Sequence, residues 1–169
     1  MNTTTTVAGR PLRVLVAEDN IINQRLVIGM LTTLGHTGVV VGDGEKALKC
    51  LSKLKFDAVL MDVMMPVLDG LGALSAIRAQ EEITGAHLPV IMATAHTEPG
   101  DAAKFKRAGA DGYVAKPIDI EHLKAELNRV WRNSCTPPSR TGCRCSCVGV
   151  GRALRRRVVN ILLECSIAR

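Results

Sequence analysis

Five short apolar runs alternate with longer segments whose apolar residues recur at helical spacing, and this alternation constrains the fold more than any other feature. The short runs are continuous, as in strands buried on both faces, whereas the longer segments have the period of amphipathic helices. The predicted strands are residues 13–17, 37–41, 56–61, 89–93 and 111–115. The predicted helices are residues 21–34, 45–55, 71–80, 99–108 and 119–131. This alternation predicts a doubly wound α/β domain, with a five-stranded parallel sheet covered by helices on both faces.

Within this class we expect the flavodoxin-like strand order 2-1-3-4-5. Apolar spacing predicts which helical residues face the sheet. These include Ile22 and Leu26 in the first helix and Leu54 in the second. Four histidines lie in separate segments without the spacing of metal ligands, so we interpret them as solvated or capping residues. They are His36, His87, His96 and His122.

Charge divides the chain into a body and a tail. Residues 1–132 hold equal numbers of basic and acidic side chains, so the net charge of +6 lies entirely in residues 133–169. The basic balance of the whole chain therefore says nothing about nucleic-acid binding by the body. We expect a polar lead-in at residues 1–10, one domain at residues 11–132 and a Cys- and Arg-rich tail that is disordered or non-native. A zinc site and a basic amphipathic helix are the alternatives for the tail.

The sequence gives no sign of a membrane segment. No apolar run approaches the ~20 residues that a membrane-spanning helix needs. The N-terminus lacks a basic start and reaches acidic residues too early for a signal peptide. We therefore expect a cytoplasmic protein with no membrane partner.

Polar residues stand at the carboxyl ends of four predicted strands. Glu18 and Asp19 follow the first strand, and Asp62 follows the third. Thr94 follows the fourth strand and Lys116 follows the fifth. Ligands of open α/β sheets bind at the edge where these carboxyl ends meet, so we expect the five side chains to converge there.

Three carboxylates in one place repel one another. At ~4 Å and an effective dielectric near 20, each like-charged pair costs roughly 4 kcal/mol, which a single lysine does not offset. An all-oxygen site of this kind suits Mg²⁺. With Lys116 and the Thr94 hydroxyl, it predicts a receptacle for a phosphoryl group that has a carboxylate as nucleophile. Asp62 is the best candidate nucleophile, because the adjacent Glu18 and Asp19 suit metal binding.

Four motifs, in this order and spacing, resemble the receiver (phosphoacceptor) domain of two-component response regulators. They are VLVAEDNIINQ, DAVLMDVMMPVLDG, PVIMATAH and GADGYVAKPI. The likeness extends to receivers attached to hybrid sensor histidine kinases. It implies that Asp62 is phosphorylated, that Asp19 binds Mg²⁺ directly and that Glu18 acts mainly through water. It also implies that the backbone carbonyl of Met64 is a metal ligand.

The resemblance further implies a conformational switch. Thr94 would bond one phosphoryl oxygen and Lys116 another, and Tyr113 would be the switch aromatic that moves inward as Thr94 shifts. The remodelled output face, formed by the fourth helix, fifth strand and fifth helix, would bind a downstream protein. A cis bond between Lys116 and Pro117 is expected, as is an influence of His96 on phosphoryl lifetime.

The implied donor is a histidine kinase or a histidine phosphotransfer domain, with no nucleic acid bound by the receiver itself. The implied oligomeric state is a monomer or a phosphorylation-dependent dimer. Such a domain is a switch that promotes its own phosphorylation and dephosphorylation, and it could be a stand-alone regulator or one module of a hybrid kinase. A haloacid-dehalogenase-type Mg²⁺-dependent phosphatase is one alternative, but it wants a second Asp where this chain has Met64. A binding-only pseudo-receiver is another, although Asp19, Asp62, Thr94 and Lys116 are all present.

Overall fold

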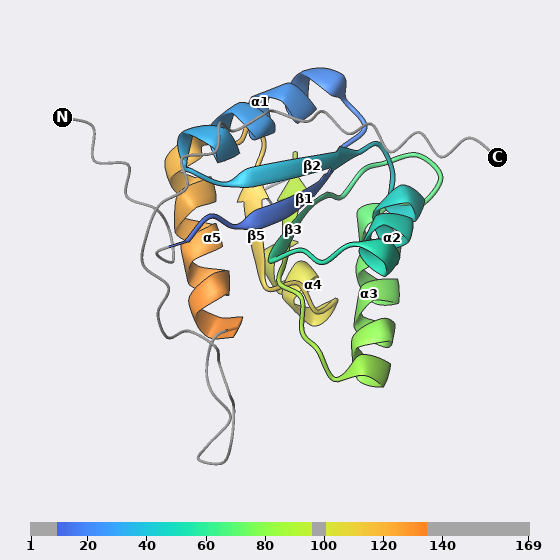
Figure 1. The fold of residues 1–169 in the computed structure, drawn as a ribbon. Coiled ribbons are helices and arrows are strands. Elements are labelled where there is room, and N and C mark those ends of the chain that lie inside the picture. Colours follow the sequence, from blue (N-terminus) through green and yellow to red (C-terminus); the bar gives the residue numbers. More distant parts are fainter. Residues whose placement is uncertain (1–9, 96–100, 135–169) are drawn as a thin grey trace, which may run out of the picture.

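A computed structural model of the protein describes residues 10–95 and 101–134. Five parallel strands form one sheet in the order β2-β1-β3-β4-β5 (Figure 1). The strands are β1 (Arg13–Ala17), β2 (Thr37–Val41), β3 (Ala58–Asp62), β4 (Val90–Thr94) and β5 (Gly112–Ala115). The helices are α1 (Ile21–Thr33), α2 (Gly44–Lys53), α3 (Gly70–Thr84), α4 (Asp101–Arg107) and α5 (Ile120–Ser134). The predicted fold class and strand order are confirmed.

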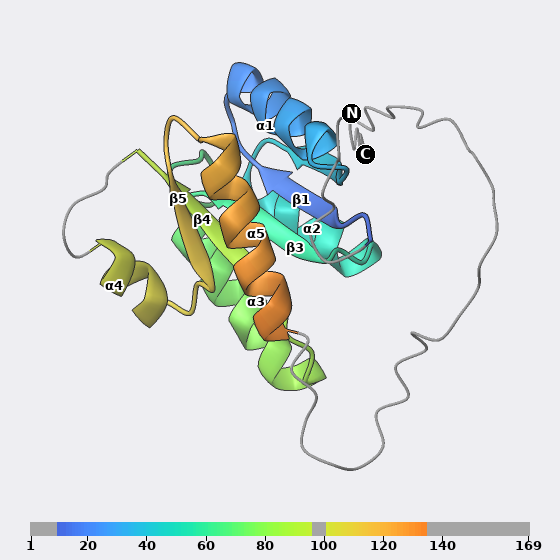
Figure 2. The same cartoon turned by 90° about the vertical axis from the view of Figure 1, so that its left-hand side faces the viewer.

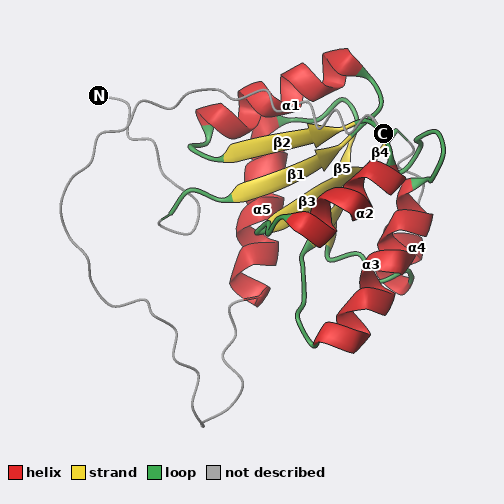
Figure 3. Cartoon of the chain, turned by 45° about the vertical axis from the view of Figure 1, so that its right-hand side comes forward, coloured by secondary structure: helices red, strands yellow, loops and turns green. Residues whose placement is uncertain are grey.

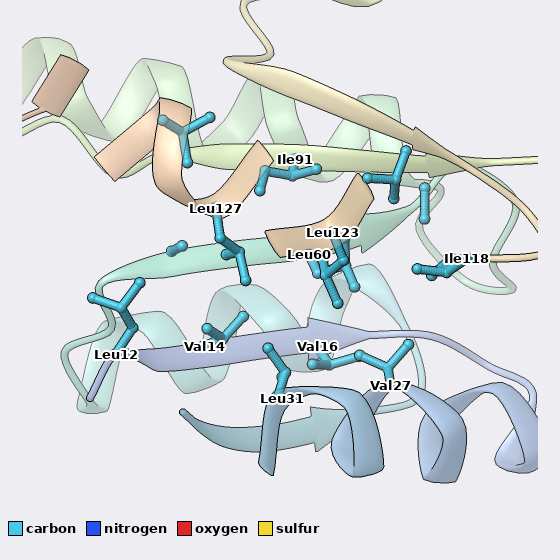
Figure 4. Close-up of a cluster of buried hydrophobic side chains, with 14 residues drawn as sticks. Leu12, Val14, Val16, Val27, Leu31, Leu60, Ile91, Ile118, Leu123 and Leu127 are labelled. Carbon is cyan, nitrogen blue, oxygen red and sulfur yellow. The ribbon is translucent and has the colours of Figure 1, made fainter. Parts of the chain in front are cut away.

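Helices cover both faces of the sheet, because each strand sends alternate side chains to opposite faces. On the face of α1 and α5, Val14 and Val16 of β1 share a buried cluster with Leu31 and Leu127 (Figures 2 and 4). On the face of α2, α3 and α4, Leu15 of the same strand belongs to a second buried cluster. Figure 3 shows the strands lying between the two sets of helices. The sheet is thus buried on both sides, as its continuous apolar runs predict.

The strand register aligns the polar strand ends at one edge of the sheet. Asp62 ends β3 and is the Cα partner of Ala93 in β4. Thr94 ends β4 and is the Cα partner of Ala115 in β5. Asp62 and Thr94 are therefore the last residues of their strands. The sequence pattern predicts each of them as the first residue after its strand.

Side-chain caps begin four of the described helices, as the residue types predict. The side chains of Asn20, Asp43 and Asp119 cap α1, α2 and α5. Asp69 Oδ1 accepts a hydrogen bond of 2.7 Å from the Gly72 amide and caps α3. Gly85 ends α3 with φ of 68°, a left-handed conformation that glycine adopts without strain. α3 therefore runs four residues beyond the predicted end at residue 80.

Three predicted core positions are wrong. Ile22 is 73% exposed and Leu26 is 47% exposed. This i, i+4 pair lies about 100° or more around α1 from Val27 and Leu31, which provide its buried contacts. Leu54 is 41% exposed, because α2 ends at Lys53 and the next residue is extended. Helical spacing identified the apolar stripe but not the part of it that the sheet covers.

The histidine prediction is wrong for His36. This residue is buried, and its Nδ1 accepts a 3.3 Å hydrogen bond from the Leu12 amide. Burial lowers the pKa of His36, so the ring is held neutral in the core. His87 and His122 are exposed, as predicted. The remaining histidine, His96, lies outside the described residues.

Several predictions fall on parts of the chain that the structure does not describe. Most of the lead-in, residues 1–9, lies there, as do the zinc and amphipathic-helix alternatives for the tail, which concern residues 135–169. Residues 96–100 include the predicted start of the fourth helix. Among the helices of residues 10–95 and 101–134, none has both the length and the apolarity needed to cross a bilayer.

Candidate functional site

Glu18, Asp19 and Asp62 lie together at the carboxyl edge of the sheet. The first two directly follow β1, and Asp62 ends β3, which pairs with β1. One carboxylate oxygen from each residue lies within 4.8 Å of the others. Glu18 and Asp62 are 3% and 5% exposed, whereas Asp19 is exposed. The fold therefore brings three acids that are distant in sequence into one partly buried cluster.

Lys116 is the counter-charge of this cluster. It follows β5, and its Nζ donates hydrogen bonds of 2.6 Å to Glu18 Oε2 and 2.6 Å to Asp62 Oδ2. Its peptide bond to Pro117 is cis. Three carboxylates face one ammonium group, which leaves an excess of negative charge. Such an all-oxygen, acidic site fits a divalent cation of the Mg²⁺ type.

The environment shifts the pKa values of the central ion pair. Burial raises the pKa of Asp62, and the hydrogen bond from Lys116 offsets this only in part. The nearby charge of Glu18 acts in the same direction as burial. Burial alone would lower the pKa of Lys116, but its hydrogen bonds to the two acids raise it. The ammonium group is thus held charged beside a carboxylate whose own charge is costly.

The second carboxylate oxygen of Asp62 faces the loop that follows β3. The Met64 amide donates a 3.2 Å hydrogen bond to Asp62 Oδ1. The Met64 side chain is 70% exposed and takes no part in this contact. A metal-ligand role for the Met64 carbonyl stays a prediction. Both oxygens of Asp62 are therefore already oriented, one by a side chain and one by the backbone.

Gly70 allows the same loop to close against the site. Its amide donates a 3.0 Å hydrogen bond to the Val63 carbonyl. A Cβ atom at this position would collide with the backbone carbonyl of Asp62. Gly70 therefore shapes this loop through a close backbone contact that only glycine permits.

Thr94 and Tyr113 lie on the β4–β5 side of the site. Thr94 is 3% exposed, and its carbonyl accepts a 2.7 Å hydrogen bond from the Lys116 amide, which ties the two strand ends together. Tyr113 is 39% exposed, and its ring centroid lies 6.4 Å from that of Phe105 in α4. The tyrosine is therefore partly exposed here, with its ring near Phe105 of α4.

Sequence reasoning missed two residues that hold Glu18 in place. Asn23 Nδ2 donates a 2.9 Å hydrogen bond to Glu18 Oε1. Gln24 Nε2 donates a 2.6 Å hydrogen bond to the backbone carbonyl of Glu18. The motif EDNIINQ could have identified them, because the side-chain amides of Asn23 and Gln24 follow the acids within two helical turns.

A doubly wound parallel sheet with polar side chains gathered where the strand order reverses is typical of α/β domains that bind ligands at that edge. The chain belongs to the response regulator receiver domain family, because the sequence model of that family matches residues 14–128. It thus carries a receiver domain of two-component systems, and the match does not favour the haloacid-dehalogenase alternative.

The relatives include receivers of hybrid kinases. The chain is 43% identical over 123 residues to hybrid signal transduction histidine kinase I of Dictyostelium discoideum, covering 70% of this chain. That match spans only 7% of the length of the kinase. The chain likewise covers only 9% of the length of a second hybrid histidine kinase from Dictyostelium discoideum. The likeness therefore concerns one module of these proteins.

Two solved structures are similar in both fold and sequence. The receiver domain of sensor histidine kinase PA1611 from Pseudomonas aeruginosa, with a magnesium ion coordinated in its active site cleft, is 37% identical with a TM-score of 0.65, covering 72% of this chain and 98% of that one. The receiver domain of Ssk1 from Saccharomyces cerevisiae, solved with the histidine phosphotransfer protein Ypd1, is 25% identical with a TM-score of 0.66. The alignment covers 70% of this chain and 87% of that one.

Proposed function

We propose that this domain is a phosphorylation switch that accepts a phosphoryl group on Asp62 from the phosphohistidine of a histidine kinase or histidine phosphotransfer domain. The observation that carries this proposal is the environment of the Asp62 carboxylate. It is nearly buried at a strand end, its two oxygens face Lys116 and the Met64 amide, and two further acids lie beside it. A carboxylate held in this way is positioned for nucleophilic attack rather than for a role in folding alone.

In the proposed transfer, one carboxylate oxygen of Asp62 forms a bond to phosphorus. The bond between phosphorus and the donor imidazole nitrogen breaks, and its electron pair stays on the imidazole. Lys116 would hold one phosphoryl oxygen by charge, and Thr94 would donate a hydrogen bond to another. The product is a mixed anhydride, which water later hydrolyses to regenerate the carboxylate.

The residues present fit a Mg²⁺ ion. Asp19, Asp62 and the Met64 carbonyl would be its direct protein ligands, and Glu18 would act through water. Glu18 suits that indirect role, because its carboxylate already accepts hydrogen bonds on both oxygens. When bound, the ion would neutralise the gathered carboxylates and the incoming phosphoryl oxygens. The magnesium ion named for the similar PA1611 receiver supports this proposal.

The donor would dock beside the acids. Apolar side chains are exposed on both chain segments that flank them, at the start of α1 and in the loop after β3. They are Ile21, Ile22, Leu26, Met64 and Val67. Exposed apolar groups grouped around a polar site are typical of a protein-binding surface. The complex that includes the Ssk1 receiver supports a histidine phosphotransfer protein as one class of donor.

The conformational change that follows phosphorylation would involve Thr94 and Tyr113. The phosphoryl group adds about −1.5 to −2 charges close to Thr94. Movement of Thr94 toward it would open space for the Tyr113 ring and remodel the face formed by α4, β5 and α5. A local charge change would thereby bias a two-state surface that binds a downstream protein.

We also propose that residues 11–132 form the receiver domain and that residues 133–169 lie outside it. The family description ends at residue 128, within the last described helix. Whether this receiver acts alone or within a hybrid kinase would be decided by its gene context and its partners.

The decisive experiment is phosphorylation of the full chain by acetyl phosphate with Mg²⁺, followed by intact-mass analysis. We expect one phosphoryl adduct that is stable in acid, labile in alkali and lost in Asp62→Asn. Asp69→Asn is the matched control, because it changes a nearby acid of the same loop and keeps a capping side chain. An adduct that persists in Asp62→Asn would overturn the assignment. Multiple turnover on small phosphate esters would instead support the phosphatase.

A further inference from the structure

The start of α1 holds Glu18 by three polar groups that the proposed phosphorylation chemistry does not use. Asn23 Nδ2 donates to Glu18 Oε1 at 2.9 Å, and the Asn20 amide lies 3.4 Å from the same oxygen. Gln24 Nε2 donates to the Glu18 carbonyl at 2.6 Å. Side chain and backbone of one acid are therefore both fixed by the first turns of the helix that follows it.

We propose that Asn23 is a positioning residue of the cation site, which sets the affinity for Mg²⁺ by fixing the orientation of the Glu18 carboxylate. This inference rests on the proposed function. It goes further, because it assigns a role to a residue that contacts neither the proposed phosphoryl group nor the proposed ion.

The geometry supports this role through the two oxygens of Glu18. Oε2 accepts from Lys116 at 2.6 Å, and Oε1 accepts from Asn23. Because donors contact both oxygens and the residue is only 3% exposed, the carboxylate is held in one orientation. Asn23 is thus the side chain that holds Oε1 in place while Lys116 binds Oε2.

Loss of the Asn23 amide would release this constraint. Glu18 Oε1 would then keep only the long contact to the Asn20 amide, and the carboxylate could turn toward Lys116. Binding of a cation would have to restore the orientation, and that ordering opposes binding. Groups that orient metal-binding residues typically change metal affinity by about 10-fold to 100-fold when they are removed.

The requirement is for an amide donor at this place. A carboxylate at position 23 would offer only acceptors to Glu18, and an alanine would offer none. A glutamine keeps the donor on a longer stem, so it should recover part of the function. The helix cap does not depend on Asn23, because the Asn20 side chain provides it.

The test is calorimetric titration of MgCl₂ into the full chain. We expect Asn23→Ala to weaken Mg²⁺ binding by about 10-fold and Asn23→Gln to recover part of the loss. The matched control is Asn128→Ala in α5, whose amide also donates within a helix, to the Lys124 carbonyl at 3.0 Å. The control should bind Mg²⁺ as the unmodified chain does.

A double-mutant cycle tests whether Asn23 acts through Glu18. In a Glu18→Gln background, Asn23→Ala should have little further effect on Mg²⁺ affinity. Thermal unfolding of each variant without Mg²⁺ identifies loss of fold. If Asn23→Ala does not fold, Asn23→Ser replaces it.

The outcomes separate this inference from the proposed function. Unchanged or tighter Mg²⁺ binding by a folded Asn23→Ala chain would overturn the inference alone. An equal loss in the Glu18→Gln background would also overturn it, because Asn23 would then act by another route. If the unmodified chain binds no Mg²⁺, both the inference and the metal dependence of the proposed function are wrong.

Discussion

Lys116 donates a 2.6 Å hydrogen bond to Asp62 across a sequence separation of 54 residues. The side chains of the pair are 17% and 6% exposed. The pairing of β3, β4 and β5 places them at the same edge of the sheet. Because a buried charge is costly without a partner, each of the two groups depends on the other in the absence of a bound cation.

Removal of Lys116 should therefore destabilise the fold. We expect Lys116→Ala to lower the free energy of unfolding by about 3 kcal/mol without Mg²⁺, because Glu18 and Asp62 lose their counter-charge. Added Mg²⁺ should recover part of this loss, since a ligand of the folded state stabilises it. Urea denaturation measures both effects. Lys124→Ala is the control, because its ion pair with Glu121 is long, at 3.4 Å, and lies on an exposed helix face. Equal stability of the two variants would contradict the prediction.

Gly70 should not tolerate a side chain. The Cβ of Gly70→Ala would collide with the Asp62 carbonyl, so we expect a loss of about 3 kcal/mol in unfolding free energy. Phosphorylation should also slow, because the acceptor is displaced. Gly29→Ala is the contrasting control, since it lies exposed within α1 with nothing within 4 Å of the added Cβ. Helix propensity predicts that this change stabilises the chain by about 0.8 kcal/mol. Similar urea midpoints for the two variants would refute the structural reason given for Gly70.

Tyr113 should report the switch, and it is the chain's single tyrosine. We expect beryllofluoride with Mg²⁺ to move its ring from the present 39% exposure to a buried position. Fluorotyrosine NMR with a solvent paramagnet measures this change in exposure. Thr94→Val should abolish the movement, because it removes the hydroxyl, whereas Thr94→Ser should keep it. An inward shift of equal size in Thr94→Val would show that the ring moves without the threonine hydroxyl.

His87 should make the stability depend on pH. Its Nδ1 lies 3.0 Å from Glu81 Oε2, and its Nε2 lies 2.7 Å from Asp111 Oδ1. Both ring nitrogens can donate only in the imidazolium form. Partial burial opposes that charge, but the two acids raise the pKa of His87 above its ordinary value. Its contribution is therefore complete below about pH 6.5 and is lost as the pH rises through the higher folded pKa.

The pH prediction is checked by NMR titration of the ring and by urea unfolding at several pH values. His87→Gln should remove the loss of unfolding free energy above about pH 6.5. Below that pH, the dependence of unfolding free energy on pH should keep its shape. His36 acts on that acid side in the opposite sense, because its lowered pKa disfavours the folded state as the pH falls below the ordinary value. A folded His87 pKa at or below its ordinary value would contradict the prediction.

Deletion of residues 135–169 should leave the domain intact. Within the described part of the chain, both buried clusters consist of residues between Leu12 and Trp131, which lie inside the proposed domain bounds. We expect the shortened chain to have the same thermal unfolding midpoint and the same phosphoryl adduct as the full chain. A clear fall in the midpoint would show that the tail packs on the domain, and the proposed boundary would then be wrong.

Much of the fold could be predicted because its signals are local. The apolar run before Asp62 and the helical period after Ile21 each depend on residues a few positions apart, and the structure has the predicted elements with small shifts in their bounds. The burial errors at Leu54 and His36 have a different cause. Whether a neighbouring layer covers a side chain depends on how the elements pack, which periodicity does not contain.

The sequence alone determined the order of the helices and strands and the polar residues at the strand ends. Both depend on residues that are close together in the chain. Tertiary structure alone decided which donor each acid receives. Lys116 bridges Glu18 and Asp62, and Asn23 takes the remaining oxygen of Glu18. Hydrogen bonds are sensitive to tenths of an ångström, and such distances are set by strand register and helix packing across the whole domain.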